Sequence, residues 1–287
     1  MKISDPRRLP NLPRDFVLGD ARFYQRIRSV ADSLPVALCY DAAVDEGSAR
    51  FHVLLEDLSE SHAVASVSSP PDGERCLLMM ECFADFHAYW WNHPDLERFG
   101  GLPADDEPLR YVRSVQATLP GFLDAVGNRL PSEVRRLYEQ FARDFGPAYA
   151  SLFSRQRMTV IHGDAHPYNV LLPRQSGGPG RIVDWQFHHV SVCTQDIRHT
   201  LGLHWNEEAR RLLERDMLRR YHQRLVARGV RGYSWDDCWQ GYRVGVIDNL
   251  FMPMWQWTLD MPQGEWFPSI GRAVAAVKEL GCHELLA

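Results

Sequence analysis

Apolar and polar positions near the start of the chain alternate in ways that predict one helix and two strands. Apolar residues spaced for a single helical face predict a helix over residues 19–30. Two β-prone runs, residues 36–44 and 51–58, are separated by an Asp-Glu-Gly-Ser segment that suits a tight turn. This arrangement predicts an antiparallel hairpin. The following residues, 59–73, are rich in Ser, Pro and charge, which is typical of a linker.

The pattern then changes to long helical segments interrupted by one block of short strands. Helical spacing of apolar residues predicts further helices over residues 74–93, 106–126, 131–152, 206–228 and 235–251. The helix from Asn206 is marked best, because Asn206 suits the cap and Gly229 follows its end. Between these helices, β-prone runs cover residues 158–161, 169–172 and 181–183. A mostly helical region therefore contains a small sheet whose strand ends are crowded with polar residues.

Composition excludes several classes of protein. The 287 residues are 45% hydrophobic and 24% charged, which is typical of a folded globular chain rather than a disordered or collagen-like one. A formal net charge of −5 gives no general attraction to nucleic acid, and the apolar runs are too short to span a bilayer. The six cysteines form no Cys-x-x-Cys pair. These features favour a cytoplasmic protein with no nucleic-acid or membrane partner, and they give no indication of oligomeric state.

The strongest chemical signal lies in the strand-rich block. Residues 159–172 have the sequence TVIHGDAHPYNVLL, and residues 181–186 have RIVDWQ. A His-x-Asp group thus follows an apolar strand, Asn169 stands five residues after Asp164, and Asp184 closes the next strand. This is the order of the protein-kinase catalytic loop and the metal-binding Asp that follows it.

These residue types suit phosphoryl transfer from ATP to an alcohol. Mg²⁺ prefers hard oxygen ligands, which Asn169 and Asp184 supply, and the attacking hydroxyl needs a proton acceptor, which Asp164 supplies. Either Asp164 or Asn169 alone is interpreted more simply as the cap of a turn. The full spacing in its strand context favours a metal-dependent phosphotransferase.

The same motifs resemble the aminoglycoside phosphotransferase and choline kinase group, which includes the ecdysteroid-kinase-like proteins. The resemblance rests on His162-Gly163-Asp164 through Asn169, on Ile182-Val183-Asp184-Trp185-Gln186 and on Gln195-Asp196-Ile197. It implies an α+β, two-lobed protein-kinase-like fold that uses ATP and magnesium. The roles it implies are Asp164 as catalytic base, Asn169 and Asp184 as metal ligands, and Asp196 as a buried brace for the catalytic loop. For Asp196, an ordinary turn or surface acid is an equally good interpretation.

The N-terminal part resembles a short, incomplete nucleotide lobe of this family. The resemblance implies that backbone groups of Leu55, Glu56 and Asp57 contact adenine, with an ordinary edge strand as the alternative. It also implies that Lys2 binds phosphate and pairs with an acid on the helix that starts near Asp20. A solvated terminal lysine is an equally good interpretation of Lys2. Two further strands and a phosphate-covering loop are expected before such a lysine, so either the start is misassigned or truncated, or the protein is a shortened variant with weakened ATP binding.

The expected organisation is a partial nucleotide-binding lobe over residues 1–58, a linker over 59–73 and a helical catalytic and substrate lobe over 74–287. The expected function is transfer of the γ-phosphate of ATP to a hydroxylated small molecule. The alternative, motivated by the missing phosphate loop, is a noncatalytic ligand-binding protein on a kinase-like scaffold. The acceptor stays open among aminoglycoside, choline, steroid and sugar alcohols, because each needs a different pocket.

Other His and Trp residues add two candidates for substrate contact. His162 and His166 stand four residues apart and a further His pair follows, but this spacing is not a zinc signature, so a zinc site is disfavoured. His162 is instead interpreted as a structural loop residue, and His166 is expected to face substrate or phosphate. Of the nine Trp residues, Trp185 is expected to contact a pocket, because it directly follows the predicted metal-binding Asp.

Overall fold

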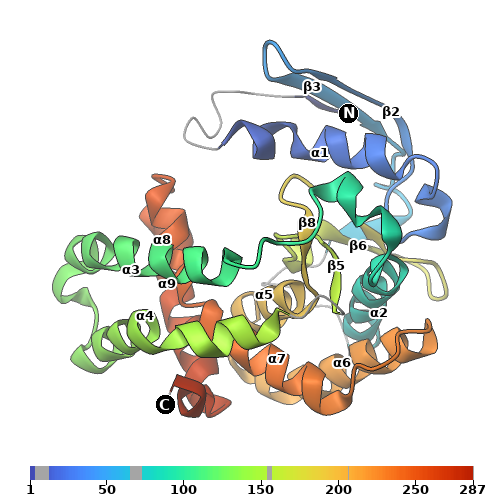
Figure 1. Ribbon diagram of the computed structural model, residues 1–287. Coiled ribbons are helices and arrows are strands. Elements are labelled where there is room, and N and C mark those ends of the chain that lie inside the picture. The colour runs from blue at the N-terminus through green and yellow to red at the C-terminus, as the bar shows by residue number, and fades with distance from the viewer. Residues whose placement is uncertain (4–12, 65–72, 154–156, 206, 287) are drawn as a thin grey trace.

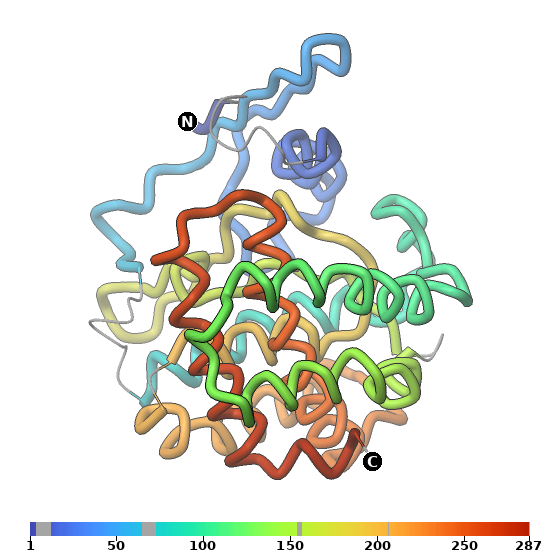
Figure 2. Tube along the Cα trace, turned by 90° about the vertical axis from the view of Figure 1, so that its left-hand side faces the viewer, coloured from blue at the N-terminus to red at the C-terminus, as the bar shows by residue number. Residues whose placement is uncertain are grey.

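The molecule consists of a small lobe that stands above a larger helical lobe (Figure 1 and Figure 2). The computed structural model describes residues 1–3, 13–64, 73–153, 157–205 and 207–286. The chain starts in the small lobe, and its last helices lie in the large lobe (Figure 1). This is the two-lobed α+β arrangement predicted from the sequence.

The small lobe is one helix packed on a three-stranded antiparallel sheet. Its elements are α1 (Arg14–Ile27), β1 (Lys2–Ile3), β2 (Cys39–Asp45) and β3 (Arg50–Leu55), with the strands in the order β1-β3-β2. The buried face of α1, which includes Phe23 and Ile27, packs on β2 and β3. The predicted hairpin is confirmed, and the Asp45 side chain accepts the Gly47 amide in its turn at 2.9 Å. The helix begins five residues earlier than predicted, at Arg14.

The segment after the hairpin, expected to be a linker, contains a strand. Strand β4 (His62–Val64) pairs antiparallel with β6 (Val170–Pro173), and Ala63 lies opposite Leu172. The polar, Ser-rich sequence hid this strand, because its stability comes from the partner strand rather than from local composition. The small lobe is therefore joined to the sheet of the large lobe by backbone hydrogen bonds.

The helices of the large lobe pack in pairs. They are α2 (Gly73–Trp90), α3 (Glu107–Val126), α4 (Ser132–Leu152), α5 (Thr194–Leu203), α6 (Glu207–Ala227), α7 (Trp235–Asp248), α8 (Phe251–Thr258) and α9 (Gln263–Glu279). Helix α2 packs on α6, α3 on α4, and α5 on α7. Figure 2 shows α3 and α4 side by side on the viewer's side of this lobe. Short 3₁₀ turns lie at Ala31–Ser33, Pro94–Phe99, Gly127–Arg129, Pro167–Asn169 and Cys282–Leu286.

Two small sheets lie between the lobes and hold the predicted catalytic residues. One pairs β5 (Met158–Ile161) with β8 (His189–Val192), and the other has the order β4-β6-β7, with β7 at Arg181–Ile182. The bounds predicted for β5 are confirmed. The loop between β5 and β6, residues 162–169, and the loop between β7 and β8, residues 183–188, leave the two sheets in the same region (Figure 1).

Several helices differ from the prediction. The single helix expected over residues 235–251 is divided into α7 and α8, with Asn249 and Leu250 between them. Helices α5 and α9 were not predicted. The expected cap of α6, Asn206, lies outside the described residues. None of the helices in the described part of the chain has both the length and the apolar character needed to cross a bilayer.

Candidate active site

The β5–β6 loop is fixed by a buried carboxylate from α5. The backbone amides of His162 and Gly163 donate to the two oxygens of Asp196 at 2.7 and 2.9 Å. His87 of α2 donates to the same carboxylate through Nε2 at 3.0 Å. Burial acts to raise the pKa of Asp196, but the bond from His87 and the neighbouring amide hold that pKa below its usual value. Asp196 is only 1% exposed, so it is not a surface acid but lies where the predicted brace would have to lie.

His162 links the two loops that carry the candidate site. Its Nδ1 accepts the Asp164 amide at 3.2 Å, so the ring proton is on Nε2, which donates to the Val183 carbonyl at 2.9 Å. The side chain is fully buried. This geometry agrees with the interpretation of His162 as a structural loop residue.

Gly163 is required by two features of its surroundings. Its φ is +82°, and a Cβ at this position would overlap the Phe187 carbonyl oxygen of the β7–β8 loop. We expect Gly163→Ala to destabilise the protein by about 2 to 3 kcal/mol, from the left-handed backbone and the overlap together. Denaturant unfolding followed by circular dichroism measures this loss. The matched control is Gly271→Ala in α9, where a Cβ meets nothing within 4 Å and alanine should stabilise the helix by about 1 kcal/mol; equal stability of both variants would contradict the expectation.

Asp164 lies between two histidines. Its Oδ1 is 3.2 Å from His199 Nε2, and its Oδ2 is 3.5 Å from His166 Nε2. Burial acts to raise the pKa of Asp164, but the two histidines hold that pKa well below its usual value. The side chain is still 30% exposed. Asp164 is therefore an ionised carboxylate that is still partly open on one side.

The pairing of β6 with β7 brings the backbone of Asn169 next to the residue that precedes Asp184. The Val183 amide donates to the Asn169 carbonyl at 3.0 Å, so Asp184 follows directly after the residue opposite Asn169. The Asn169 side-chain amide donates to the Asp164 carbonyl at 3.0 Å and contacts His166 Nε2 at 3.3 Å. No hydrogen bond to the Asn169 Oδ1 occurs within the described residues. Asp184 has φ +66° and a side chain that is 41% exposed.

These two side chains fit a magnesium site. An amide oxygen and a carboxylate are hard donors, and Mg²⁺ is usually held by one or two carboxylates together with water and substrate phosphates. Within the described ranges, no group of three or more His, Cys, Asp or Glu forms a metal site made by protein alone. A magnesium ion held by these two side chains would need water and phosphate oxygens to complete its shell.

Lys2 joins the small lobe to this site. Its Nζ lies 2.6 Å from Asp184 Oδ1 and 3.1 Å from Asp20 Oδ2 of α1. Burial acts to lower the pKa of Lys2, but the two carboxylates raise it above its usual value. A freely solvated terminal lysine is therefore the wrong interpretation. The pairing with an acid on α1 is the one that the family resemblance implied.

Helix α1 lies directly on the β7–β8 loop. Asp20, which is 1% exposed, accepts the Trp185 backbone amide at 2.8 Å. A Cβ at Gly19 would overlap the Gln186 carbonyl oxygen, so the helix backbone touches the loop backbone. The side chain of Trp185 is fully buried and stacks on Phe23 with ring centroids 4.1 Å apart. The prediction that Trp185 contacts substrate is wrong, because the indole has no exposed surface and belongs to the core.

Residues 55–57, the segment expected to contact adenine, already use some of their polar groups in hydrogen bonds within the protein. The Glu56 amide donates to the Leu38 carbonyl at 2.9 Å, and the Glu56 side chain accepts the Leu38 amide at 2.9 Å. Asp57 accepts the Ser59 amide and hydroxyl through Oδ1. The Glu56 N–H is therefore not available for a nucleotide, which leaves the other backbone groups of residues 55–57 as candidates.

An aromatic cavity of about 430 Å³ opens beside Asp164, and sequence reasoning missed it. Gly163, His199 and Phe187 bring it next to the β5–β6 loop. The other aromatic walls come from α1, α3 and α8: Phe16, Tyr111, Phe251 and Trp255. These residues are up to 239 positions apart in the chain, so no local motif could reveal them. Tyr111, His189, Gln195, Arg198 and Phe251 also line a second cavity of about 590 Å³, so the two spaces adjoin.

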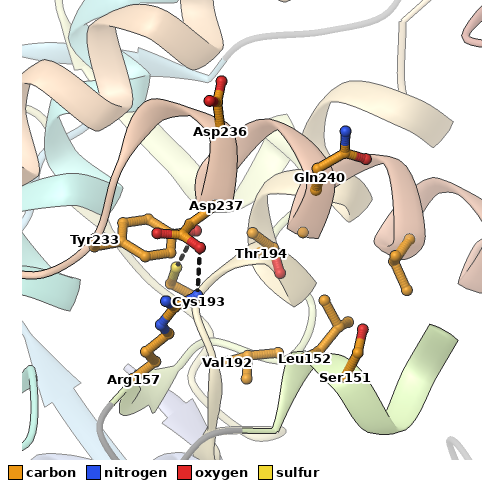
Figure 3. Close-up of a pocket in the computed structure, with 12 residues that line it drawn as sticks. Ser151, Leu152, Arg157, Val192, Cys193, Thr194, Tyr233, Asp236, Asp237 and Gln240 are labelled. Atoms are coloured by element: carbon orange, nitrogen blue, oxygen red, sulfur yellow. Dashed lines mark hydrogen bonds and ion pairs between the residues drawn. The ribbon is translucent and has the colours of Figure 1, made fainter. Parts of the chain in front are cut away.

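A third cavity, of about 290 Å³, lies away from this site (Figure 3). It is lined by Val192 and Cys193, at the end of the β5–β8 pair opposite to Ile161 and His189. Arg157 and Asp237 form an ion pair at 2.8 Å beside it (Figure 3). None of the predicted site residues lines this cavity, so we do not connect it with the candidate chemistry.

Comparisons with known proteins agree with this fold. The model of the Ecdysteroid kinase-like family matches residues 21–229, whereas no curated protein sequence matches the chain. A choline/ethanolamine kinase family protein from Mesorhizobium loti has a TM-score of 0.59 and 15% identity, covering 96% of this chain and 83% of that one. Choline kinase from Cryptosporidium parvum Iowa II has a TM-score of 0.61 and 12% identity, with coverages of 97% and 81%. The GDP complex of aminoglycoside 2′-phosphotransferase-IIIa has a TM-score of 0.59 and 13% identity, with coverages of 95% and 84%.

At these identities the structural matches show a shared protein-kinase-like fold and nothing finer. The family model is more specific, because it covers most of the chain and includes the loops that carry Asp164, Asn169 and Asp184. The chain therefore belongs to the ecdysteroid kinase-like family.

Proposed function

We propose that this protein transfers the γ-phosphoryl group of ATP to a hydroxyl group of a small molecule bound in the aromatic cavity. The observation that carries the proposal is the position of Asp164: its neighbour Gly163 and its contact His199 both line that cavity, and Asp184 of the next loop pairs with Lys2 of the small lobe. In the reaction the hydroxyl oxygen forms a bond to phosphorus, the bond to the bridging oxygen of ADP breaks, and Asp164 takes the hydroxyl proton.

The remaining residues act by position and charge. Mg²⁺, when bound, neutralises phosphate charge during the transfer. Asn169 and Asp184 are the residues that would hold it. Lys2 supplies a positive charge next to Asp184, where it would meet the triphosphate. Asp196 and His162 keep the β5–β6 loop in one shape, so that the base needs little reorganisation when the acceptor arrives.

The cavity favours one kind of acceptor over another. Its walls are mainly aromatic, and its polar groups come from His189, Gln195, Arg198 and His199. Among the described residues its own lining contains no Asp or Glu, and the adjoining cavity adds Glu107 and Asp248, of which Asp248 is already paired with Arg198, whereas a polycationic aminoglycoside would need several acidic partners. An acceptor with an apolar ring body and few polar groups fits this lining better.

The test is a transfer assay with a panel of hydroxylated ring compounds, choline and aminoglycosides. Both ATP and GTP should be supplied, because one structural relative is a GDP complex. We expect a phosphorylated product that disappears when Mg²⁺ is chelated and returns when Mg²⁺ is restored. Turnover that is insensitive to chelation would contradict the proposed metal role. Nucleotide-dependent thermal stabilisation without any nucleotide consumption would favour the noncatalytic alternative.

A further inference from the structure

We propose that His199 is a positioning residue for Asp164, whose Oδ1 lies 3.2 Å from the His199 Nε2. The proposal rests on the proposed function, because it concerns the same carboxylate. His199 lies on α5, 35 residues after Asp164 in the chain, and belongs to none of the motifs that identify the site. It is 5% exposed, and its ring both touches Asp164 and lines the aromatic cavity.

The neighbours of the His199 ring favour one position for its proton. Nε2 of His199 is 3.2 Å from Asp164 Oδ1 and 3.2 Å from Nε2 of His204. A carboxylate accepts and does not donate, so the His199 Nε2 carries the proton. That single N–H lies between Asp164 Oδ1 and His204 Nε2, so the His204 Nε2 carries no proton of its own and its ring is neutral. Burial lowers the pKa of His204 well below its usual value, in agreement with a neutral ring.

The second carboxylate oxygen is held less closely. His166 Nε2 is 3.5 Å from Asp164 Oδ2 and 3.3 Å from the Asn169 side-chain nitrogen, and a hydrogen bond from that nitrogen leaves His166 Nε2 no proton to donate to the carboxylate. One oxygen of Asp164 is therefore anchored by a buried imidazole on a helix, and the other has weaker contacts on its own loop. A carboxylate held in this way keeps one oxygen free to turn toward an incoming hydroxyl.

This arrangement separates the roles of the two residues. Asp164 would accept the proton, and His199 would set the direction of its lone pairs. A misplacement of about 1 Å in a reacting group can lower a rate by 10²-fold, so loss of the anchor should act on the rate of the bound complex rather than on nucleotide binding. If His199 only packed in the core, its replacement would lower the fraction of folded protein and would leave the kcat of the folded molecules unchanged.

Two substitutions distinguish positioning from packing. His199→Leu fills the space without a donor, whereas His199→Gln keeps an N–H at similar reach. With the acceptor found in the panel, we expect His199→Leu to lower kcat about 10- to 100-fold with the KM for nucleotide changed less than about twofold. His199→Gln should recover most of that loss. His222→Leu in α6, which removes a histidine bonded to the Tyr233 carbonyl, is the matched control and should leave kcat unchanged.

Each rate is divided by the concentration of folded protein, which comes from an unfolding curve measured for each variant. Equal losses in the Leu and Gln variants, or an unchanged kcat in His199→Leu, would overturn the positioning role. A second measurement is independent of transfer. In ¹⁵N NMR of the full chain, the two ring nitrogens of His199 are identified as the resonances that are missing from the spectrum of His199→Gln. In the wild type, the Nε2 resonance should be that of a protonated nitrogen.

The two measurements separate failure of this inference from failure of the proposed function. An unprotonated Nε2 on His199 rejects the inference, whatever the transfer assay gives. A protonated Nε2 in a protein that transfers no phosphate to any acceptor rejects the proposed function, and with it the catalytic meaning of the contact.

Discussion

Replacing Asp164 by asparagine should lower kcat by about 10²- to 10⁴-fold, which is the usual contribution of a general base. The substitution keeps the size of the side chain and can keep its contact with His199, but removes the charge that accepts the proton. The affinity for nucleotide should change little, because the residues that we propose for binding phosphate and metal, Lys2, Asn169 and Asp184, remain. Product formation at saturating acceptor measures the rate, and nucleotide-induced thermal stabilisation measures binding.

The matched control for this substitution is Asp216→Asn on an exposed face of α6. It makes the same chemical change at a distance from the site and should retain the wild-type kcat. Full activity of Asp164→Asn would show that another group takes the proton. Loss of nucleotide binding together with activity would show that Asp164 acts on the nucleotide instead.

Replacing Asp196 by asparagine should destabilise the fold by about 3 to 5 kcal/mol, the cost of breaking a buried, paired charge. The carboxylate accepts hydrogen bonds from His162, Gly163 and His87, and asparagine would turn an N–H toward at least one of these donors. Denaturant unfolding measures the loss. The same Asp216→Asn control should stay within about 0.5 kcal/mol of the wild type.

The pH dependence gives a second check on Asp196. Its pKa is below the usual value of 3.8 in the folded state, so its stabilising contribution is complete above that value and is lost as the pH falls through the lower folded pKa. The stability difference between wild type and Asp196→Asn should therefore narrow below pH 3.8. A difference that stays constant into the acid range would mean that charge is not what stabilises the loop.

Elements with strong local signals were predictable from the sequence. Strand β5 has the predicted bounds, and the helices expected over 106–126 and 131–152 differ by one residue at the start. Helix α5 was missed because its short sequence mixes Thr, His and Gly and is stabilised by packing on α7. Helix α9 was also not predicted; an internal proline does not explain this, because Pro268 of α9 has counterparts in Pro120 of α3 and Pro147 of α4, two helices that were predicted.

The residues of the candidate site also divide into those with a local sequence signal and those without one. Asp164, Asn169 and Asp184 lie on one stretch of 21 residues, and their spacing carries the signal. The pairing of Lys2 with Asp20 was anticipated through the resemblance, because each element has a counterpart in the family. His199, His204 and the aromatic cavity depend on contacts between distant segments, which no spacing rule contains. Trp185 was misjudged because sequence position does not tell which side of a turn faces the core.

The contact of α1 with the β7–β8 loop has a consequence for control of the protein. Protein kinases are switched by moving the helix whose acid pairs with the phosphate-binding lysine. Here a swing of that helix would leave the Trp185 amide without its acceptor, expose Phe23 and the indole beneath it, and separate backbones that touch at Gly19. An on–off mechanism based on such a swing would cost these contacts, so we expect α1 to stay packed against the β7–β8 loop.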